Sequence, residues 1–203
     1  MACSLTRGKN VQCKDQLGGL KKVFFVENYC SDIRAKATFN SDADQMDTAG
    51  FANWDVASGA GIVTVYQYDL RPNLSSMTIN VTSDPATGST FFEQTLNLQL
   101  QRLSVRDTME VKLLAYNRAQ IFVQDQNDNV FLLGMDNGCD VSGGTVVTGV
   151  ARGDMSGYTL DFTAQEKEAC IWLPAPGAVG TAKFPFDGLS DESALTITTG
   201  VDS

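Results

Sequence analysis

Two stretches of alternation between apolar and polar residues constrain the fold of this 203-residue chain more than any other feature. In residues 77–82 the odd positions are apolar and the even positions polar, and residues 92–101 repeat the pattern with opposite parity. A period of two places apolar side chains on one face of a β-strand and polar side chains on the other. We therefore predict a long hairpin over residues 74–103, with an inward face made by Met77, Ile79, Val81, Leu96, Leu98 and Leu100.

Shorter runs rich in β-branched and aromatic residues predict further strands, over residues 22–27, 62–68, 119–124, 130–135, 145–150, 158–163 and 195–198. Residues 126–129 (Gln-Asn-Asp-Asn) have the composition of a hairpin turn. The predicted fold class is mainly β, an antiparallel β-sandwich or barrel. Residues 1–173 are expected to form a single β-rich domain with a loop insertion around residues 31–61. Residues 174–203 are a C-terminal extension, extended or docked on a neighbour.

One flanking helix is predicted over residues 104–116. Ser104 is a suitable N-cap, and Asp107 stands three residues later, where a capping box places an acidic or amide side chain. Val105, Met109 and Leu113 recur every four residues, so we expect this stripe, helped by Leu114, to lie on a sheet. Asn117 is a reasonable end for the helix.

Composition excludes several classes of function. The chain has no histidine, which rules out Ser-His-Asp and Cys-His catalysis and metal sites with histidine ligands. Its net charge of −9 argues against coating a nucleic-acid backbone, which depends on Lys and Arg. The five cysteines include no C-x-x-C pair, so we expect them to be reduced. Neither a signal peptide nor an apolar run of about 20 residues is seen, so no membrane partner is expected.

Local motifs give little support for an enzyme. Asp125-x-Asn127-x-Asn129 resembles the start of a calcium loop, but Val130 occupies the position that needs glycine, which favours the hairpin turn. Glu166 and Glu168 are a carboxylate pair of the kind that glycosidases use, but nothing places them across a cleft. We therefore predict no catalytic, cofactor-binding or metal-binding residue and no cofactor.

The predicted hairpin is poor in charge, which is unusual for exposed strands. Between residues 73 and 101 the only charged side chains are Asp84 and Glu93. Natural sheets protect open edges with Lys, Pro or bulges, because unprotected edges recruit other chains. The polar face therefore suits pairing with a neighbouring subunit, although a hairpin internal to one sandwich stays an alternative. The candidate subunit-contact residues are Thr78, Asn80, Thr82, Asp84, Pro85, Thr87, Thr95, Asn97 and Gln99.

Residues 91–96 (FFEQTL), 129–134 (NVFLLG) and 153–162 (GDMSGYTLDF) resemble virion structural proteins of tailed bacteriophages, most of all the tail tube proteins. The resemblance covers residues 66–168 and lies in their layout. It implies a self-assembling, non-enzymatic protein, made in the host cytoplasm and located in the virion. It further implies hexameric rings and hairpins lining a lumen through which DNA passes without sequence-specific binding. Other phage tail or neck proteins are the implied partners.

Two alternatives stay open at this point. Residues 1–61 and 175–203 depart from a minimal tube protein, so a neck, tail-terminator or capsid-auxiliary role also fits. A monomeric carbohydrate- or receptor-binding β-sandwich is an alternative from another class. It would need exposed aromatic side chains near loop carboxylates, for which Trp54 and Trp172 are the candidates.

Overall fold

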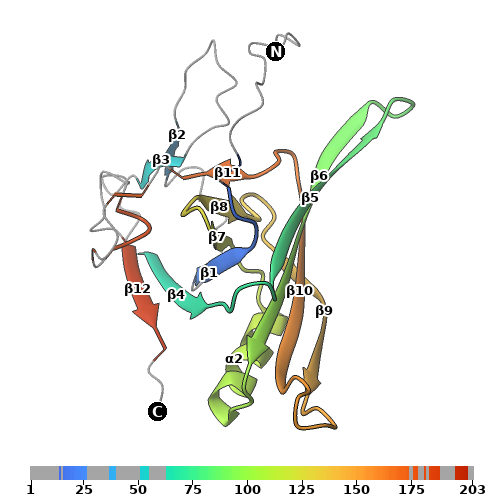
Figure 1. The fold of residues 1–203 in the computed structure, drawn as a ribbon. Coiled ribbons are helices and arrows are strands. Elements are labelled where there is room, and N and C mark those ends of the chain that lie inside the picture. The colour runs from blue at the N-terminus through green and yellow to red at the C-terminus, as the bar shows by residue number, and fades with distance from the viewer. Residues whose placement is uncertain are drawn as a thin grey trace.

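The structure is a computed structural model, and it describes residues 14, 16–26, 37–39, 51–54, 63–173, 176–177, 181, 183–187 and 195–200. Over these ranges the chain forms two main β-sheets with one helix beside them (Figure 1). The two sheets face each other across a shared apolar core and do not close into a barrel. The prediction of a mainly β sandwich with one flanking helix is confirmed, and the barrel alternative is not.

The larger sheet has six strands in the order β11-β8-β7-β1-β4-β12. Its neighbours pair antiparallel, except that β12 runs parallel to β4, a departure from the purely antiparallel sheet that we expected. The strands are β1 (Leu20–Val26), β4 (Val63–Asp69), β7 (Ile121–Asp125), β8 (Val130–Leu133), β11 (Ile171–Trp172) and β12 (Leu195–Thr199).

The smaller sheet has four antiparallel strands in the order β5-β6-β10-β9. They are β5 (Ser76–Asp84), β6 (Ser89–Gln101), β9 (Asp140–Val147) and β10 (Gly157–Glu166). The hairpin predicted over residues 74–103 is therefore present as β5 and β6. A third, two-stranded sheet pairs β2 (Ala37–Phe39) with β3 (Phe51–Trp54), within the predicted insertion at residues 31–61. The rest of that insertion lies outside the described residues.

The core between the two main sheets comes from alternate residues of their central strands. From the larger sheet, β1 contributes Val23 and Phe25, and β7 contributes Ile121 and Val123. The smaller sheet supplies Leu96, Leu98, Leu160 and Phe162. Burial of this apolar surface is the main source of stability, at about 25 cal/mol per Å² removed from water.

The opposite face of the larger sheet is buried as well. Phe24 and Phe122 point to this face, and the ring of Phe186 packs edge-on against both, at centroid distances of 5.0 and 5.2 Å. Burial on both faces explains why residues 23–26 of β1 and 121–123 of β7 are unbroken apolar runs instead of alternating ones. Because Phe186 and Leu195 belong to this core, these parts of the C-terminal extension fold with the domain that precedes them.

The strand predicted over residues 145–150 is wrong in its position. The observed strand, β9, covers residues 140–147, and the chain then turns at Gly149, whose φ is +73°. The carboxylate of Asp154 holds this turn by accepting hydrogen bonds from the backbone amides of Val150 and Ala151, at 2.9 and 2.7 Å. The turn residues that end β9 were included in the predicted strand because Val147 and Val150 are both β-branched.

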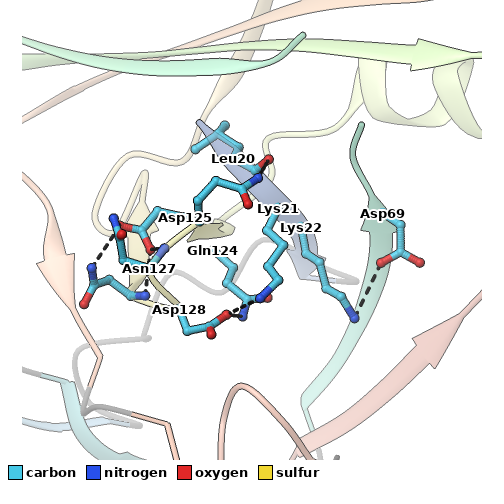
Figure 2. A network of polar contacts seen from close by, with 10 residues as sticks. Leu20, Lys21, Lys22, Asp69, Gln124, Asp125, Asn127 and Asp128 are labelled. Atoms are coloured by element: carbon cyan, nitrogen blue, oxygen red, sulfur yellow. Dashed lines mark hydrogen bonds and ion pairs between the residues drawn. The ribbon is translucent and has the colours of Figure 1, made fainter. Parts of the chain in front are cut away.

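The turn between β7 and β8 also anchors the start of β1 (Figure 2). The carboxylate of Asp125 accepts hydrogen bonds from the backbone amides of Asn127 and Asn129, both at 2.8 Å, which confirms the predicted hairpin turn. The Asn127 side chain bonds both the amide and the carbonyl of Leu17. Lys21 forms an ion pair with Asp128 at 2.7 Å. Asp125 therefore organises its own turn, and no metal-ligating cluster occurs among the described residues.

Candidate functional site

The feature that sets this sandwich apart is the outer part of the β5–β6 hairpin, residues 79–92, here called the arm. In Figure 1 the arm extends well beyond the rest of the sandwich. Every residue from 80 to 90 is exposed, whereas Leu96 and Leu98, further along β6, are fully buried. The inner part of the hairpin therefore belongs to the core, and the arm projects from it and is accessible to a second molecule.

The tip of the arm is closed by its own hydrogen bonds. The backbone carbonyl of Asp84 accepts from the amide of Gly88 at 2.9 Å, and the carboxylate of Asp84 accepts from the amide of Ala86 at 2.9 Å. Gly88 has a φ of +67°, a left-handed conformation that glycine adopts without strain. Below the tip, the hydroxyls of Ser83 and Thr90 lie 2.9 Å apart across the strands. These contacts hold the two strands together to the end of the projection.

The strand register places the predicted apolar residues on one face, but burial of that face ends part-way along. Met77 is opposite Leu96 and Val81 is opposite Phe92, as the alternation requires. However, Val81 is 63% exposed, so the prediction that it packs inward is wrong. The reason is length, since at Val81 the hairpin has already passed the edge of the core.

One buried polar residue on that face was not identified from the sequence. Gln94 occupies an apolar-face position and is buried. Its side-chain oxygen accepts a hydrogen bond from the backbone amide of Gly134 at 2.9 Å, and its side-chain nitrogen donates to the carbonyl of Ala169. Gln94 thus links the base of the hairpin to the loops around it, and a polar residue in an apolar position was the available signal.

The nine candidate subunit-contact residues lie on the outer face of the hairpin and at its tip. Thr95 and Gln99 are half-buried and the other seven are exposed. Asn97 donates to the carboxylate of Asp161, and Gln99 contacts the sulfur of Met155, so both are used within the subunit. Thr78, Asn80 and Thr82, by contrast, are exposed candidate residues of β5 whose side chains make no hydrogen bond within the described part of the subunit.

β5 is also an edge strand. The order of the smaller sheet gives it one neighbour, β6, so the main-chain groups along its other side have no strand partner within the described ranges. Residues 76–83 contain no charged residue and no proline. An edge of this length without such protection is a template for pairing with another chain.

The helix α2 (Val105–Tyr116) begins and ends as predicted. The Ser104 hydroxyl accepts a hydrogen bond from the backbone amide of Asp107 at 3.0 Å, and the amide of Asn117 donates to the carbonyl of Leu113 at 3.1 Å. The N-cap and the helix end are confirmed.

The predicted packing face of α2 is wrong. Val105 is 86% exposed, Met109 59% and Leu113 62%, and Tyr116 on the same side is 82% exposed. Leu114 is the buried residue, and Val111 packs against the core beside it. The helix is therefore rotated so that its most regular apolar stripe faces away from the sandwich. We call Val105, Met109, Leu113 and Tyr116 the α2 stripe.

A cavity of about 940 Å³ lies where α2 meets the ends of β4 and β6. Its wall carries charges of both signs, namely Asp69, Arg71, Arg102, Arg106, Asp107, Glu110 and Asp154. Burial, followed by the charges of Glu110 and Asp107, raises the pKa of Tyr68 in this wall to about 12. The mixture of charges matches no single class of ligand.

Glu166 and Glu168, the carboxylate pair noted in the sequence, are in different environments. Glu166 is buried, and its carboxylate accepts hydrogen bonds from the backbone amides of Asp136 and Asn137, at 3.1 and 2.8 Å. Glu168 is exposed. The contacts of Glu166 hold the turn that follows β8.

Two of the five cysteines lie in the described residues, and both are free thiols. Burial raises the pKa of the Cys139 thiol far above its ordinary value and raises the pKa of Cys170 to about 11. Both are thus protonated at neutral pH. Cys3, Cys13 and Cys30 lie outside the described residues.

Comparison with known proteins identifies no relative of this chain. No model of a known protein family, no curated protein and no solved structure matches this chain. Within the described ranges, no helix combines the length and apolar content of a membrane span. Over the described residues, the protein is a two-sheet β-sandwich with one flanking helix and a projecting hairpin arm.

Proposed function

We propose that this protein is a non-enzymatic, self-assembling structural protein of a tailed bacteriophage virion, and that it forms the tail tube. The observation that supports this most is the arm, which projects from the sandwich and carries the unprotected edge of β5. Strand addition at such an edge gives affinity through main-chain hydrogen bonds. A ring requires every subunit to carry a surface that binds its neighbour, and the edge of β5 can supply one.

The assembly is proposed as stacked hexameric rings around a DNA conduit, as the resemblance to tail tube proteins implies. The charge is compatible with that role. Each subunit carries −9, and a ring of subunits sums this into a strong field of one sign. DNA phosphates passing such a wall are not bound by it. Acidity alone also suits many other proteins, so it supports the proposal without selecting it.

A neck, tail-terminator or capsid-auxiliary role uses the same arm and differs only in which layer of the virion the protein forms. The monomeric carbohydrate-binding alternative has less support. Trp172 is 43% exposed, but its ring packs edge-on against Phe131 at a centroid distance of 4.5 Å. This ring is thus partly used in packing within the chain.

The test is the mass of the purified full chain in solution, measured over a range of concentrations and paired with negative-stain microscopy. We expect rings or tubes whose mass is a multiple of 21.9 kDa. A monodisperse 21.9 kDa species at all concentrations would contradict the proposal, and sugar binding by that species would favour the alternative.

A further inference from the structure

The α2 stripe is an apolar surface that the fold leaves uncovered. Val105, Met109, Leu113 and Tyr116 lie within 80° of one another around the helix at 100° per residue, and all are exposed. Single exposed apolar residues are ordinary, but a contiguous stripe of four marks a place where another surface binds. The helix could have turned this stripe inward, and instead buries Leu114.

The borders of the stripe are cationic in an otherwise acidic chain. Arg106 flanks it on one side and Lys112 on the other, and both are exposed. Residues 102–118 hold four Lys or Arg and two Asp or Glu, a local balance of 4 − 2 = +2, while the whole chain carries −9. A surface that complements this stripe has an apolar centre and acidic or uncharged edges.

The arm has that complementary character. Val81 is exposed on its apolar face, and Ile79 and Phe92 beside it are partly exposed. Between residues 74 and 101 no Lys or Arg occurs, and the two charges are Asp84 and Glu93. The arm therefore offers apolar side chains without any cation that would repel Arg106 or Lys112.

The dimensions also agree. The stripe covers eleven residue steps of helix, or about 16 Å at 1.5 Å per residue. From Ile79 to Asp84 the arm covers five steps of strand, or about 17 Å at 3.3 Å per residue. In Figure 1 the tip of the arm and α2 lie at opposite ends of the smaller sheet, so one chain does not bring them together.

We propose that the α2 stripe binds the arm of a second copy of this chain. The contact joins two different surfaces, so it repeats from subunit to subunit and generates a closed ring or a tube. This inference rests on the proposed function and deepens it, because it names the surface that receives the arm.

The test compares three aspartate substitutions at exposed apolar positions. Val81→Asp places a charge on the arm, and Met109→Asp places one in the stripe. Val150→Asp is the matched control, since Val150 is fully exposed in the turn after β9 and belongs to neither surface. All three variants are expected to melt like the parent. We expect the first two to lose rings or tubes, and the control to assemble like the parent.

A disulfide cross-linking experiment tests directly whether the arm contacts the α2 stripe. Val81→Cys and Met109→Cys proteins are made separately, mixed, assembled and oxidised, and the products are mapped by mass spectrometry. We expect a disulfide between the two substituted positions in the mixture, and none between them in either protein alone.

The outcomes separate the two proposals. If the parent protein never assembles, the proposed function fails. If the parent assembles and Met109→Asp assembles equally well, the stripe is not an assembly surface and this inference is overturned, while the proposed function stands. If Met109→Asp abolishes assembly but Val81→Asp does not, the stripe binds some other surface and the pairing with the arm is likewise overturned.

Discussion

The hydroxyl oxygens of Tyr158 on β10 and Thr108 on α2 lie 2.7 Å apart. The Tyr158 hydroxyl also donates to the carbonyl of Ser104, the N-cap residue, at 3.0 Å. Tyr158 is fully buried, so these contacts fix the first turn of the helix against the smaller sheet. With that turn anchored, Leu114 faces the core and Leu113 faces outward.

Tyr158→Phe tests this anchor. The substitution keeps the buried ring and removes the hydroxyl, so it deletes the contacts with Ser104 and Thr108 alone. We expect a loss of about 0.5–1.5 kcal/mol in the free energy of unfolding, the net contribution of a typical hydrogen bond, because Thr108 is exposed and the Ser104 carbonyl still accepts from the amide and the hydroxyl of Thr108. Urea denaturation followed by circular dichroism measures it, and an unchanged midpoint would mean that the hydroxyl does not hold the helix.

Two adjacent leucines test the rotation of α2. Leu114→Ala empties a buried position and is expected to cost about 2–4 kcal/mol. Leu113→Ala changes a side chain that is mostly in water and is expected to cost within about 0.5 kcal/mol. The same denaturation experiment on both variants decides the orientation. Equal losses of unfolding free energy in the two variants, or a larger loss for Leu113→Ala, would mean that the α2 stripe packs against the sheet.

The sequence was sufficient for the strands and for the ends of the helix, because both depend on local chemistry. Alternation identified β5, β6 and β10, and the Ser104 cap with Asn117 identified the limits of α2. Turn chemistry at residues 126–129 was equally readable, because the Asp125 carboxylate bonds to amides only a few residues away.

What the sequence did not show depends on contacts between distant segments. The outward rotation of α2 follows from Tyr158, which is 50 residues away from Thr108. The exposure of Val81 depends on where the opposing sheet ends, and the parallel pairing of β12 with β4 joins residues more than 100 positions apart. A deficit of charge indicates the candidate contact residues, whereas the spacing of the α2 stripe predicts core packing.

Tyr68 gives a prediction about pH. Its pKa is raised to about 12, first by burial and then by Glu110 and Asp107, so the folded state favours the neutral phenol. In an unfolded chain tyrosine ionises near pH 10. The stabilisation is therefore complete below pH 10 and is lost as the pH rises toward 12. We expect the free energy of unfolding to decrease more between pH 8 and pH 11 for the parent than for Tyr68→Phe. An equal decrease in the two proteins would contradict the raised pKa of Tyr68.

The thiols give a prediction about reactivity. Cys139 is buried and Cys170 partly buried, and burial raises the pKa of both, so few thiolates form at pH 8. In native protein we expect iodoacetamide to modify Cys170 slowly and Cys139 more slowly still. After denaturation without reductant, five free thiols are expected, and three or fewer would reveal a disulfide. Peptide mapping distinguishes the positions.

The most direct test of the central claim shortens the arm. Residues 84–88 are deleted and replaced by Asn-Gly, which suits a two-residue hairpin turn. All five removed residues are exposed, so the melting temperature should stay close to that of the parent. Negative-stain microscopy with mass measurement should then show rings or tubes for the parent and monomers for the variant. Rings or tubes from the shortened protein, as abundant as those from the parent, would contradict the account.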